Sequence, residues 1–438
     1  MNRFLKYSLL TTSFTAILIT GLIIFFLDPD NYKSLIIKHV KKEMHRELEF
    51  DGDISLTIFP KLGISLDHFS LSEYKSSKKF VTAEHIHFTL PLQSILRNRL
   101  VIDEIIVTRP KAALIRFPDG RMNIDDLLAT DEKTTAFDIG DVRIDDAALV
   151  LHDTMRKKQV ILRDMTLGIH KITDESLDQL ELKTTGTIVN IGGNKDKQNV
   201  AIRLNIPNLL FNNNSLESNY VNLAILIANP ANRITGTFSL SNITAATNRF
   251  NSDVMTVKLA AKKDAQTVRI HLKSSLTGNP ETQKFYLPDL KANFTAIIPD
   301  LPNQLISGSL AGKIFVASLS ERLQANLAGN LEDSHIQAKF NLSNFSNPTI
   351  DFDIAIDTLN IDRWLSSADK QNRQHIETQL LDEAIDFSFL AELNANGSIH
   401  IGMLQSADVT LSGMEFKIKS DHYRQNSATT LLDNASVK

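Results

Sequence analysis

Apolar and polar residues alternate along most of this chain, and this pattern restricts the folds that it can adopt. The stretch from residue 47 to residue 128 is the clearest case, with a break at Pro60 to Gly63. Side chains of a strand point to opposite faces at every second residue, so the stretch predicts strands with one apolar face and one polar face. The apolar positions around the break are Ile54, Leu56, Ile58, Ile64 and Leu66.

The same alternation returns in many later segments. Turn signals such as Gly192-Gly193-Asn194 and Gly278-Asn279-Pro280 separate them. The pattern predicts a mostly β protein in which a long antiparallel β meander forms an elongated groove or a sandwich. Apolar positions that share a face are Val200, Ile202, Leu204 and Ile206; Val221, Leu223, Ile225 and Ile227; Met255, Val257 and Leu259; Val268, Ile270 and Leu272; Ile336, Ala338, Phe340 and Leu342; and Ile350, Phe352, Ile354 and Ile356.

The amino-terminal segment is apolar enough to cross a membrane. Residues 8–27 contain no charged side chain, and at about 1.5 Å per residue a helix of this length would span roughly 30 Å. The alternative is a cleaved signal peptide, which needs a shorter apolar run that ends in a small-x-small site. Here the run continues into Asp28-Pro29, so we favour an uncleaved transmembrane anchor with a short tail, residues 1–29.

An amphipathic helix is expected directly after the anchor, over residues 30–48. Apolar residues recur there at helical spacing, with lysines between them. Such a helix could lie on anionic lipid headgroups. It could also cap the open end of the β body, which is the interpretation that we favour.

Composition argues against several classes of protein. The net charge is −4, with 47 basic and 51 acidic residues, so the chain has no excess of positive charge for nucleic acid. The absence of cysteine excludes disulfides, thiolate metal sites and cysteine nucleophiles. The sequence has no nucleophile elbow, phosphate-binding glycine loop, zinc-protease helix or dinucleotide turn. We therefore expect no enzyme, no catalytic residues and no cofactor.

Two pairs of polar residues have spacings that could support chemistry. His85 and His87 would project from one side of a strand and could share a metal, and Asp351 and Asp353 could do acid–base work. Both pairs alternate with apolar neighbours, as solvated residues on the polar face of a strand do. We favour that interpretation for both pairs and predict no metal site.

Several motifs carry a family resemblance. Residues 52–66 read G-D-I-S-L-T-I-F-P-K-L-G-I-S-L, residues 89–96 read T-L-P-L-Q-S-I-L, residues 102–107 read I-D-E-I-I-V, and residues 119–128 read D-G-R-M-N-I-D-D-L-L. In residues and order these segments resemble the amino-terminal part of the AsmA family of Gram-negative envelope proteins. Later segments, D-T-L-N-I-D-R-W-L from Asp357 and I-H-I-G-M-L from Ile399, also resemble the family. The resemblance covers most of residues 1–418, and the family's carboxy-terminal portion is expected to be shortened here.

The resemblance implies a function. It places the chain in the bacterial inner membrane, with one span and with its body in the periplasm, where it would act in outer-membrane biogenesis. Basic residues on both sides of the span do not settle this orientation by themselves. AsmA-like proteins resemble bridge-like lipid transporters, whose β units build an apolar groove that conducts phospholipid.

Two hypotheses differ in whether the apolar face of the sheet is packed inside the protein or left open. Composition alone favours a sandwich that packs on itself, whereas the resemblance favours an open groove. In the groove, Ile54, Leu56, Ile58, Ile64 and Leu66 would bind lipid near the membrane end. In the sandwich they would be ordinary core, and the protein would be a scaffold or assembly factor that binds outer-membrane proteins or envelope enzymes through sheet edges.

The expected organisation of the chain has six parts. They are the tail and anchor at 1–29, the amphipathic helix at 30–48, a first β module at 49–130, an extended β body at 131–365, a polar linker at 366–380, and a short carboxy-terminal β segment with its tail at 381–438.

Overall fold

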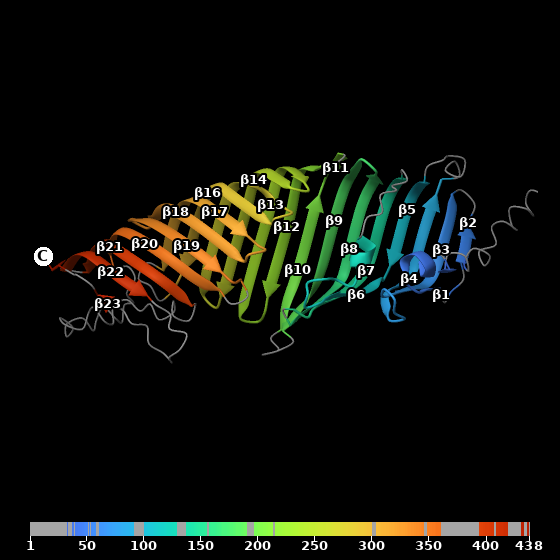
Figure 1. Ribbon diagram of the computed structural model, residues 1–438, viewed down its shortest axis with the longest axis horizontal. Helices are drawn as coiled ribbons and strands as arrows, with labels where there is room; N and C mark the ends of the chain where they lie inside the picture. The colour runs from blue at the N-terminus through green and yellow to red at the C-terminus, as the bar shows by residue number, and fades with distance from the viewer. Residues whose placement is uncertain are drawn as a thin grey trace, which may run out of the picture. The chain divides into compact units, whose positions relative to one another are not determined.

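A computed structural model describes most of the chain (Figure 1). The described residues are 33, 37–38, 40–50, 52, 54–57, 61–91, 100–128, 137–155, 157–190, 197–212, 215–299, 304–345, 348–360, 394–406, 409–418, 431–432 and 436–437. The predicted span at 8–27, the predicted linker at 366–380 and Ile58 lie outside these residues. Within the described ranges, no helix has the length and apolar character needed to cross a bilayer.

The structure describes residues 33, 37–38 and 40–48 of the predicted amphipathic helix. Lys33, Ile37 and Lys38 are helical, and a π-helical turn, η1, follows at Val40–Met44. The helix was expected to reach Leu48, but Leu48 instead begins strand β1, because its backbone pairs with Leu71. Leu48 is buried, so its place in the apolar pattern reflects burial in the sheet and not a helix face.

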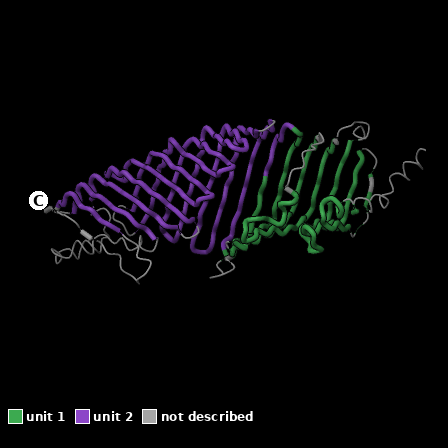
Figure 2. Tube along the Cα trace, in the orientation of Figure 1, with its two compact units in different colours: residues 1–174, 182–197 green, residues 175–181, 198–438 purple. Residues whose placement is uncertain are grey.

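The protein is mostly β, as the alternation predicts, and it divides into two units (Figure 2). Unit 1 comprises residues 1–174 and 182–197, and unit 2 comprises residues 175–181 and 198–438. The strands of unit 1 are β1 (Leu48–Phe50), β2 (Ile54–Thr57), β3 (Leu62–Ser72), β4 (Lys79–Leu90), β5 (Leu100–Thr108), β6 (Lys111–Arg116), β7 (Phe137–Asp153) and β8 (Lys158–Thr173), with a short helix α3 (Asp125–Leu128). Strand β9 (Ser176–Asn190) is divided between the units.

Unit 2 continues with strands that are mostly long. They are β10 (Lys197–Ile206, of which Lys197 belongs to unit 1), β11 (Leu209–Asn212), β12 (Ser215–Ala228), β13 (Asn232–Ala246), β14 (Arg249–Lys263), β15 (Gln266–Asn279), β16 (Lys284–Ile297), β17 (Leu305–Ala317), β18 (Arg322–Leu331), β19 (Ser334–Ser343), β20 (Thr349–Asn360), β21 (Ala395–Ser406), β22 (Val409–Ile418), β23 (Leu431–Leu432) and β24 (Ser436–Val437). From β12 to β20, each strand pairs antiparallel with the next one in sequence.

The sheet is mixed, in contrast to the purely antiparallel meander that was predicted. Strands β5 and β6 both pair parallel with β7, and β20 pairs parallel with β21. Parallel neighbours need a long connection, and residues 117–136 and 361–394 supply one before β7 and β21. Alternation reports which face a side chain occupies and carries no information about strand direction, so the sequence pattern could not reveal these pairings.

A line of irregular pairing crosses the middle strands of unit 2. The register shifts between Ser252 and Met255 where β14 pairs β15, at Lys273/Thr277 where β15 pairs β16, and at Leu287/Leu290 where β16 pairs β17. We call this line the bend, because a bulge kinks a strand and increases its twist. The buried hydroxyl of Ser252 at the bend donates to the carbonyl oxygen of Ser241 at 2.8 Å.

Two clusters of buried side chains lie in unit 2. One surrounds the bend and contains Leu240, Ile243, Met255, Leu287 and Leu290. The other joins β20, β21 and β22 and contains Phe352, Ala395, Ile399, Ile401, Leu404, Met414, Phe416 and Ile418. Large parts of the apolar face between these clusters are only partly buried, which makes that face the candidate site.

Candidate functional site

The strand pairing of unit 1 brings the predicted lipid-contact positions together. Ile54 lies opposite Leu66, and Leu56 lies opposite Ile64, where β2 pairs β3. Residues directly opposite in an antiparallel pair share a face. Ile54, Ile64 and Leu66 are half-buried, while Ile58 lies outside the described residues.

Two apolar rows extend from these positions across the rest of unit 1. One row runs from Ile64 through Phe88, Ile105, Val142 and Ile169. The other runs from Leu66 through Ile86, Val107, Ile144 and Leu167. Sequence reasoning missed these partners. Alternation along each strand marks their apolar face, but it does not reveal which residues lie opposite one another on neighbouring strands.

The opposite face of unit 1 is polar, and it holds both histidines that were considered as metal ligands. His85 Nδ1 lies 2.7 Å from Asp67 Oδ1, and His87 Nδ1 lies 2.8 Å from Ser65 Oγ. The two imidazole rings are stacked with centroids 6.4 Å apart. Each ring therefore has a partner on a neighbouring strand, as expected for polar residues on a solvated face.

The two aspartates considered for acid–base work both lie on strand β20. Asp351 is opposite Asn341 of β19, and Asp353 is opposite Lys339. Asp353 also forms a long ion pair with His400 of β21, at 3.8 Å. Both carboxylates are exposed, as polar residues on a solvated face are.

Unit 2 carries a longer apolar row. The row begins on β10, passes to its partner β12, and then crosses every strand as far as β22. Each member lies directly opposite the next one on the neighbouring strand. Such a row is a continuous strip of apolar surface along one face of the sheet. Its members are Leu204, Leu223, Phe238, Val257, Leu272, Ala292, Leu310, Gly329, Ile336, Ile356, Ile401 and Met414.

Burial on this face falls with distance from the bend. On β13, Leu240 is 8% exposed, whereas Ile234 on the same face is 45% exposed. On β14, the exposed fraction rises from 5% at Met255 to 41% at Leu259. The apolar face is thus covered beside the bend and open toward the other ends of these strands.

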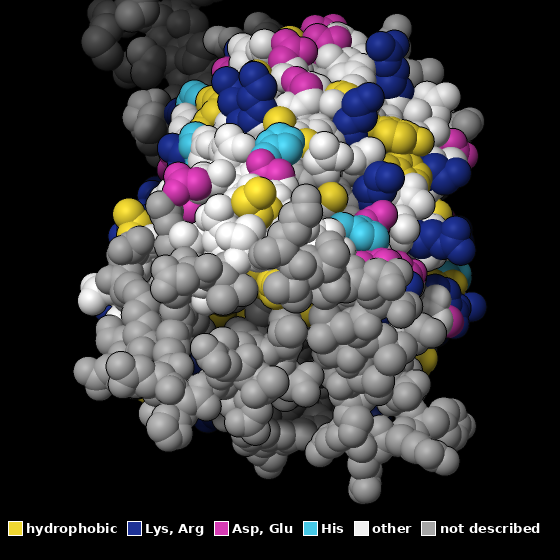
Figure 3. Space-filling model, turned by 90° about the vertical axis from the view of Figure 1, so that its left-hand side faces the viewer, with side chains coloured by type: hydrophobic (Ala, Val, Ile, Leu, Met, Phe, Trp, Pro, Cys, Tyr) yellow, Lys and Arg dark blue, Asp and Glu magenta, His cyan; other side chains and the backbone are white. Residues whose placement is uncertain are grey.

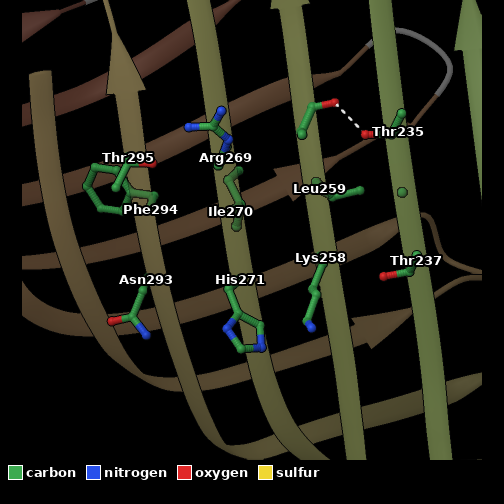
Figure 4. A pocket seen from close by; sticks show the side chains of 12 residues that line it. Thr235, Thr237, Lys258, Leu259, Arg269, Ile270, His271, Asn293, Phe294 and Thr295 are labelled. Atoms are coloured by element: carbon green, nitrogen blue, oxygen red, sulfur yellow. Dashed lines mark hydrogen bonds between the residues drawn. The ribbon is translucent and has the colours of Figure 1, made fainter. Parts of the chain in front are cut away.

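A depression of about 450 Å³ lies on the open part of the face (Figure 4). Its floor is a cross-strand series, Gly236, Leu259, Ile270 and Phe294. Figure 4 shows the side chains of Leu259, Ile270 and Phe294 on adjacent strands. The ring of Phe294 extends over Gly308 of β17, where a Cβ atom would come within 2.4 Å of the ring. Glycine is therefore required beneath Phe294.

A second depression, of about 360 Å³, lies on the same face nearer the strand ends. Its floor is the next cross-strand series, Ile227, Ile234, Ala261 and Val268. Apolar depressions of this size can hold part of a small molecule or a lipid chain.

The surface that Figure 3 shows is mixed. In this view, basic, acidic and histidine side chains are intermingled, with isolated apolar side chains between them. A mixed surface of this kind is typical of a solvated face and gives no single-sign field.

Comparison with known proteins identifies relatives of the chain. A model of the AsmA family matches residues 1–421. Protein AsmA of Escherichia coli (strain K12) is 22% identical over 219 residues, which cover 47% of this chain and 33% of that protein. The match therefore spans about a third of the length of this relative. No solved structure matches.

Proposed function

Because this chain belongs to the AsmA family, we propose that it acts in outer-membrane biogenesis by conducting phospholipid between the inner and outer membranes along its apolar face. The observation that carries the proposal is the unbroken apolar row of unit 2, from Leu204 to Met414, with its partly exposed floor. Water-exposed apolar surface is costly, and a soluble sheet normally covers it.

The physical mechanism needs no bond to be made or broken. Each methylene group that leaves a bilayer for water costs about 0.8 kcal/mol, so free transfer of a whole acyl chain is very slow. An apolar row that accepts the chain step by step removes most of this cost. The protein would act as a conduit and not as an enzyme, without a cofactor or a catalytic residue.

The proposal also covers the parts of the chain near the membrane. Residues 8–27 would anchor the protein in the inner membrane, with residues 1–7 in the cytoplasm and both units in the periplasm. Ile54, Leu56, Ile58, Ile64 and Leu66 would then receive lipid near that membrane. The rows that continue from Ile64 and Leu66 across unit 1 support this role, because they extend the apolar strip beyond the first strands.

A photo-crosslinking experiment tests the proposal in cells. A benzophenone amino acid replaces Leu259 in the full chain, and the adducts formed after irradiation are identified by mass spectrometry. The matched control places the same amino acid at the exposed Lys273 of the adjacent strand β15, which alternates with Leu272 of the apolar row and does not line the depression.

We expect phospholipid adducts at position 259 and none above background at position 273. Equal adduct formation at both positions, or none at either, would overturn the lipid conduit. Adducts with outer-membrane proteins at position 259 would instead support the scaffold hypothesis.

A further inference from the structure

The second depression differs from the first in having a polar rim. Its apolar floor, Ile227 to Val268, ends at the hairpins that join β12 to β13 and β14 to β15. The polar residues that line it are Gln198, Asn229, Asn232, Lys262, Lys263 and Gln266. Apolar floor and polar rim together make an amphiphilic site.

Strand register puts the charge of this rim on the apolar side of the sheet. Lys263 is two residues after Ala261 on β14, so it shares the face of the apolar floor, while Lys262 has the opposite face. Lys263 also lies directly opposite Asn232. No carboxylate lines the depression in the part of the chain that the structure describes. The site therefore favours an anionic group beside Asn232.

Asn232 carries a hydrogen-bond acceptor that nothing in the described structure satisfies. Its side-chain Oδ1 is buried and has no partner. The neighbouring Asn229 differs, since its Oδ1 accepts from the backbone N–H groups of Ala231 and Asn232 at 3.1 and 2.7 Å. Buried polar atoms almost always have a partner, so an orphan acceptor on a cavity residue points to a missing donor. A turn of the Asn232 amide would present the oxygen to a group in the depression.

The strip from this rim to the bend is long enough for an acyl chain. Lys263 and Met255 are eight residues apart on β14, which corresponds to about 26 Å of strand. Half of a bilayer's hydrocarbon core is about 15 Å thick. An acyl chain that starts beside Lys263 would thus lie over the exposed Leu259 and end before the buried side chains at the bend.

We propose that this rim is a resting site for a phospholipid whose headgroup carries a hydrogen-bond donor, such as ethanolamine or glycerol. This inference rests on the proposed function and adds a headgroup preference to it. The phosphate lies beside Lys263, and an N–H or O–H of the headgroup donates to Asn232 Oδ1. A choline headgroup has no such donor and leaves the oxygen unpaired.

Headgroup competition tests the inference. The full chain in detergent is incubated with equal amounts of phosphatidylethanolamine and phosphatidylcholine, and bound lipid is counted by native mass spectrometry. The variants are Asn232→Leu, which removes the acceptor, and Lys263→Gln, which removes the cation. Arg233→Gln is the matched control, because it removes the cation next to Asn232 that lies on the opposite face and outside the depression.

We expect the unaltered protein to enrich phosphatidylethanolamine about threefold to tenfold, as one hydrogen bond allows. Asn232→Leu should bring the ratio close to one without lowering total bound lipid. Lys263→Gln should weaken binding of both lipids, and Arg233→Gln should leave the binding of both unchanged. Thermal unfolding separates binding from folding, since removal of an unpaired acceptor should not lower the melting temperature.

Different results overturn different claims. Phospholipid binding without headgroup preference, or a preference that Asn232→Leu retains, would overturn this inference and leave the proposed function intact. Equal effects of Arg233→Gln and Lys263→Gln would also overturn it. Failure of the unaltered protein to bind either lipid would overturn the proposed function itself.

Discussion

Arg46 and Asp126 form a two-point ion pair that joins the start of the β body to helix α3. The guanidinium Nε donates to Asp126 Oδ2 at 2.9 Å, and NH2 donates to Oδ1 at 2.7 Å. Arg46 is fully buried and also donates to the carbonyl oxygens of Ser72 and Asn123, at 2.8 and 2.9 Å. Its guanidinium lies 5.1 Å from the centroid of the Phe80 ring. One side chain thus holds together segments that are distant in sequence at one end of unit 1.

Replacement of Arg46 by Met should destabilise this end of unit 1 strongly. The change leaves the Asp126 carboxylate and two carbonyl oxygens without their donor. Because the Asp126 side chain is 24% exposed, the expected loss is smaller than the about 3–5 kcal/mol of a fully buried pair. Hydrogen exchange followed by mass spectrometry should show faster exchange in residues 46–128. Lys41→Gln is the control, since the Lys41–Glu47 pair is exposed and worth less than about 1 kcal/mol. Comparable exchange in both variants would contradict a central role for Arg46.

The same pair predicts how this region responds to acid. The hydrogen bond from Arg46 is the main cause that lowers the pKa of Asp126 below its ordinary value of 3.8. A carboxyl whose pKa is lower in the folded state stabilises the fold above its unfolded pKa, and this contribution is lost as pH falls through the folded value. Protection of residues 46–128 from exchange should therefore decrease below about pH 4. Asp126→Asn should remove that pH dependence, and an unchanged acid profile in this variant would refute the assignment.

The fit of Phe294 over Gly308 predicts a size limit at that position. The methyl group of Gly308→Ala would come within 2.4 Å of the Phe294 ring and 2.7 Å of the backbone oxygen of Asn330, and overpacking of this kind costs about 1–3 kcal/mol. Thermal unfolding should show the loss, and the double variant with Phe294→Leu should recover part of it. Gly168→Ala provides the control, because a Cβ at Gly168 meets no atom within 4 Å. A single Gly308→Ala variant as stable as Gly168→Ala would show that the ring can move aside without cost.

The sequence predicts the faces of the strands better than their neighbours. Alternation placed Ile54 and Leu66 on one apolar face, and the register pairs them directly. It could not predict the Arg46–Asp126 pair, because the partners are 80 residues apart and no local periodicity links them. The bend was equally hidden, since a bulge depends on how two strands pair. In the sequence, Asn232 is an ordinary turn asparagine, and only the folded hairpin shows that its side-chain oxygen has no partner.

The exposure gradient on β13 predicts that one substitution will have opposite outcomes at its two ends. Leu240→Asp puts a carboxylate into the buried cluster at the bend, where an unpaired polar group costs several kcal/mol, so unit 2 should lose its cooperative thermal unfolding. Ile234→Asp changes a side chain on the same strand and face that is already 45% exposed, so the expected loss is about 1 kcal/mol or less. Circular dichroism of both variants during heating measures the difference. Both variants introduce an aspartate on the same face of the same strand, so a difference in their stability reflects how deeply each position is buried. Equal, severe destabilisation would mean that the face is closed core along its whole width, as in the packed sandwich, and that no open strip is available to a lipid.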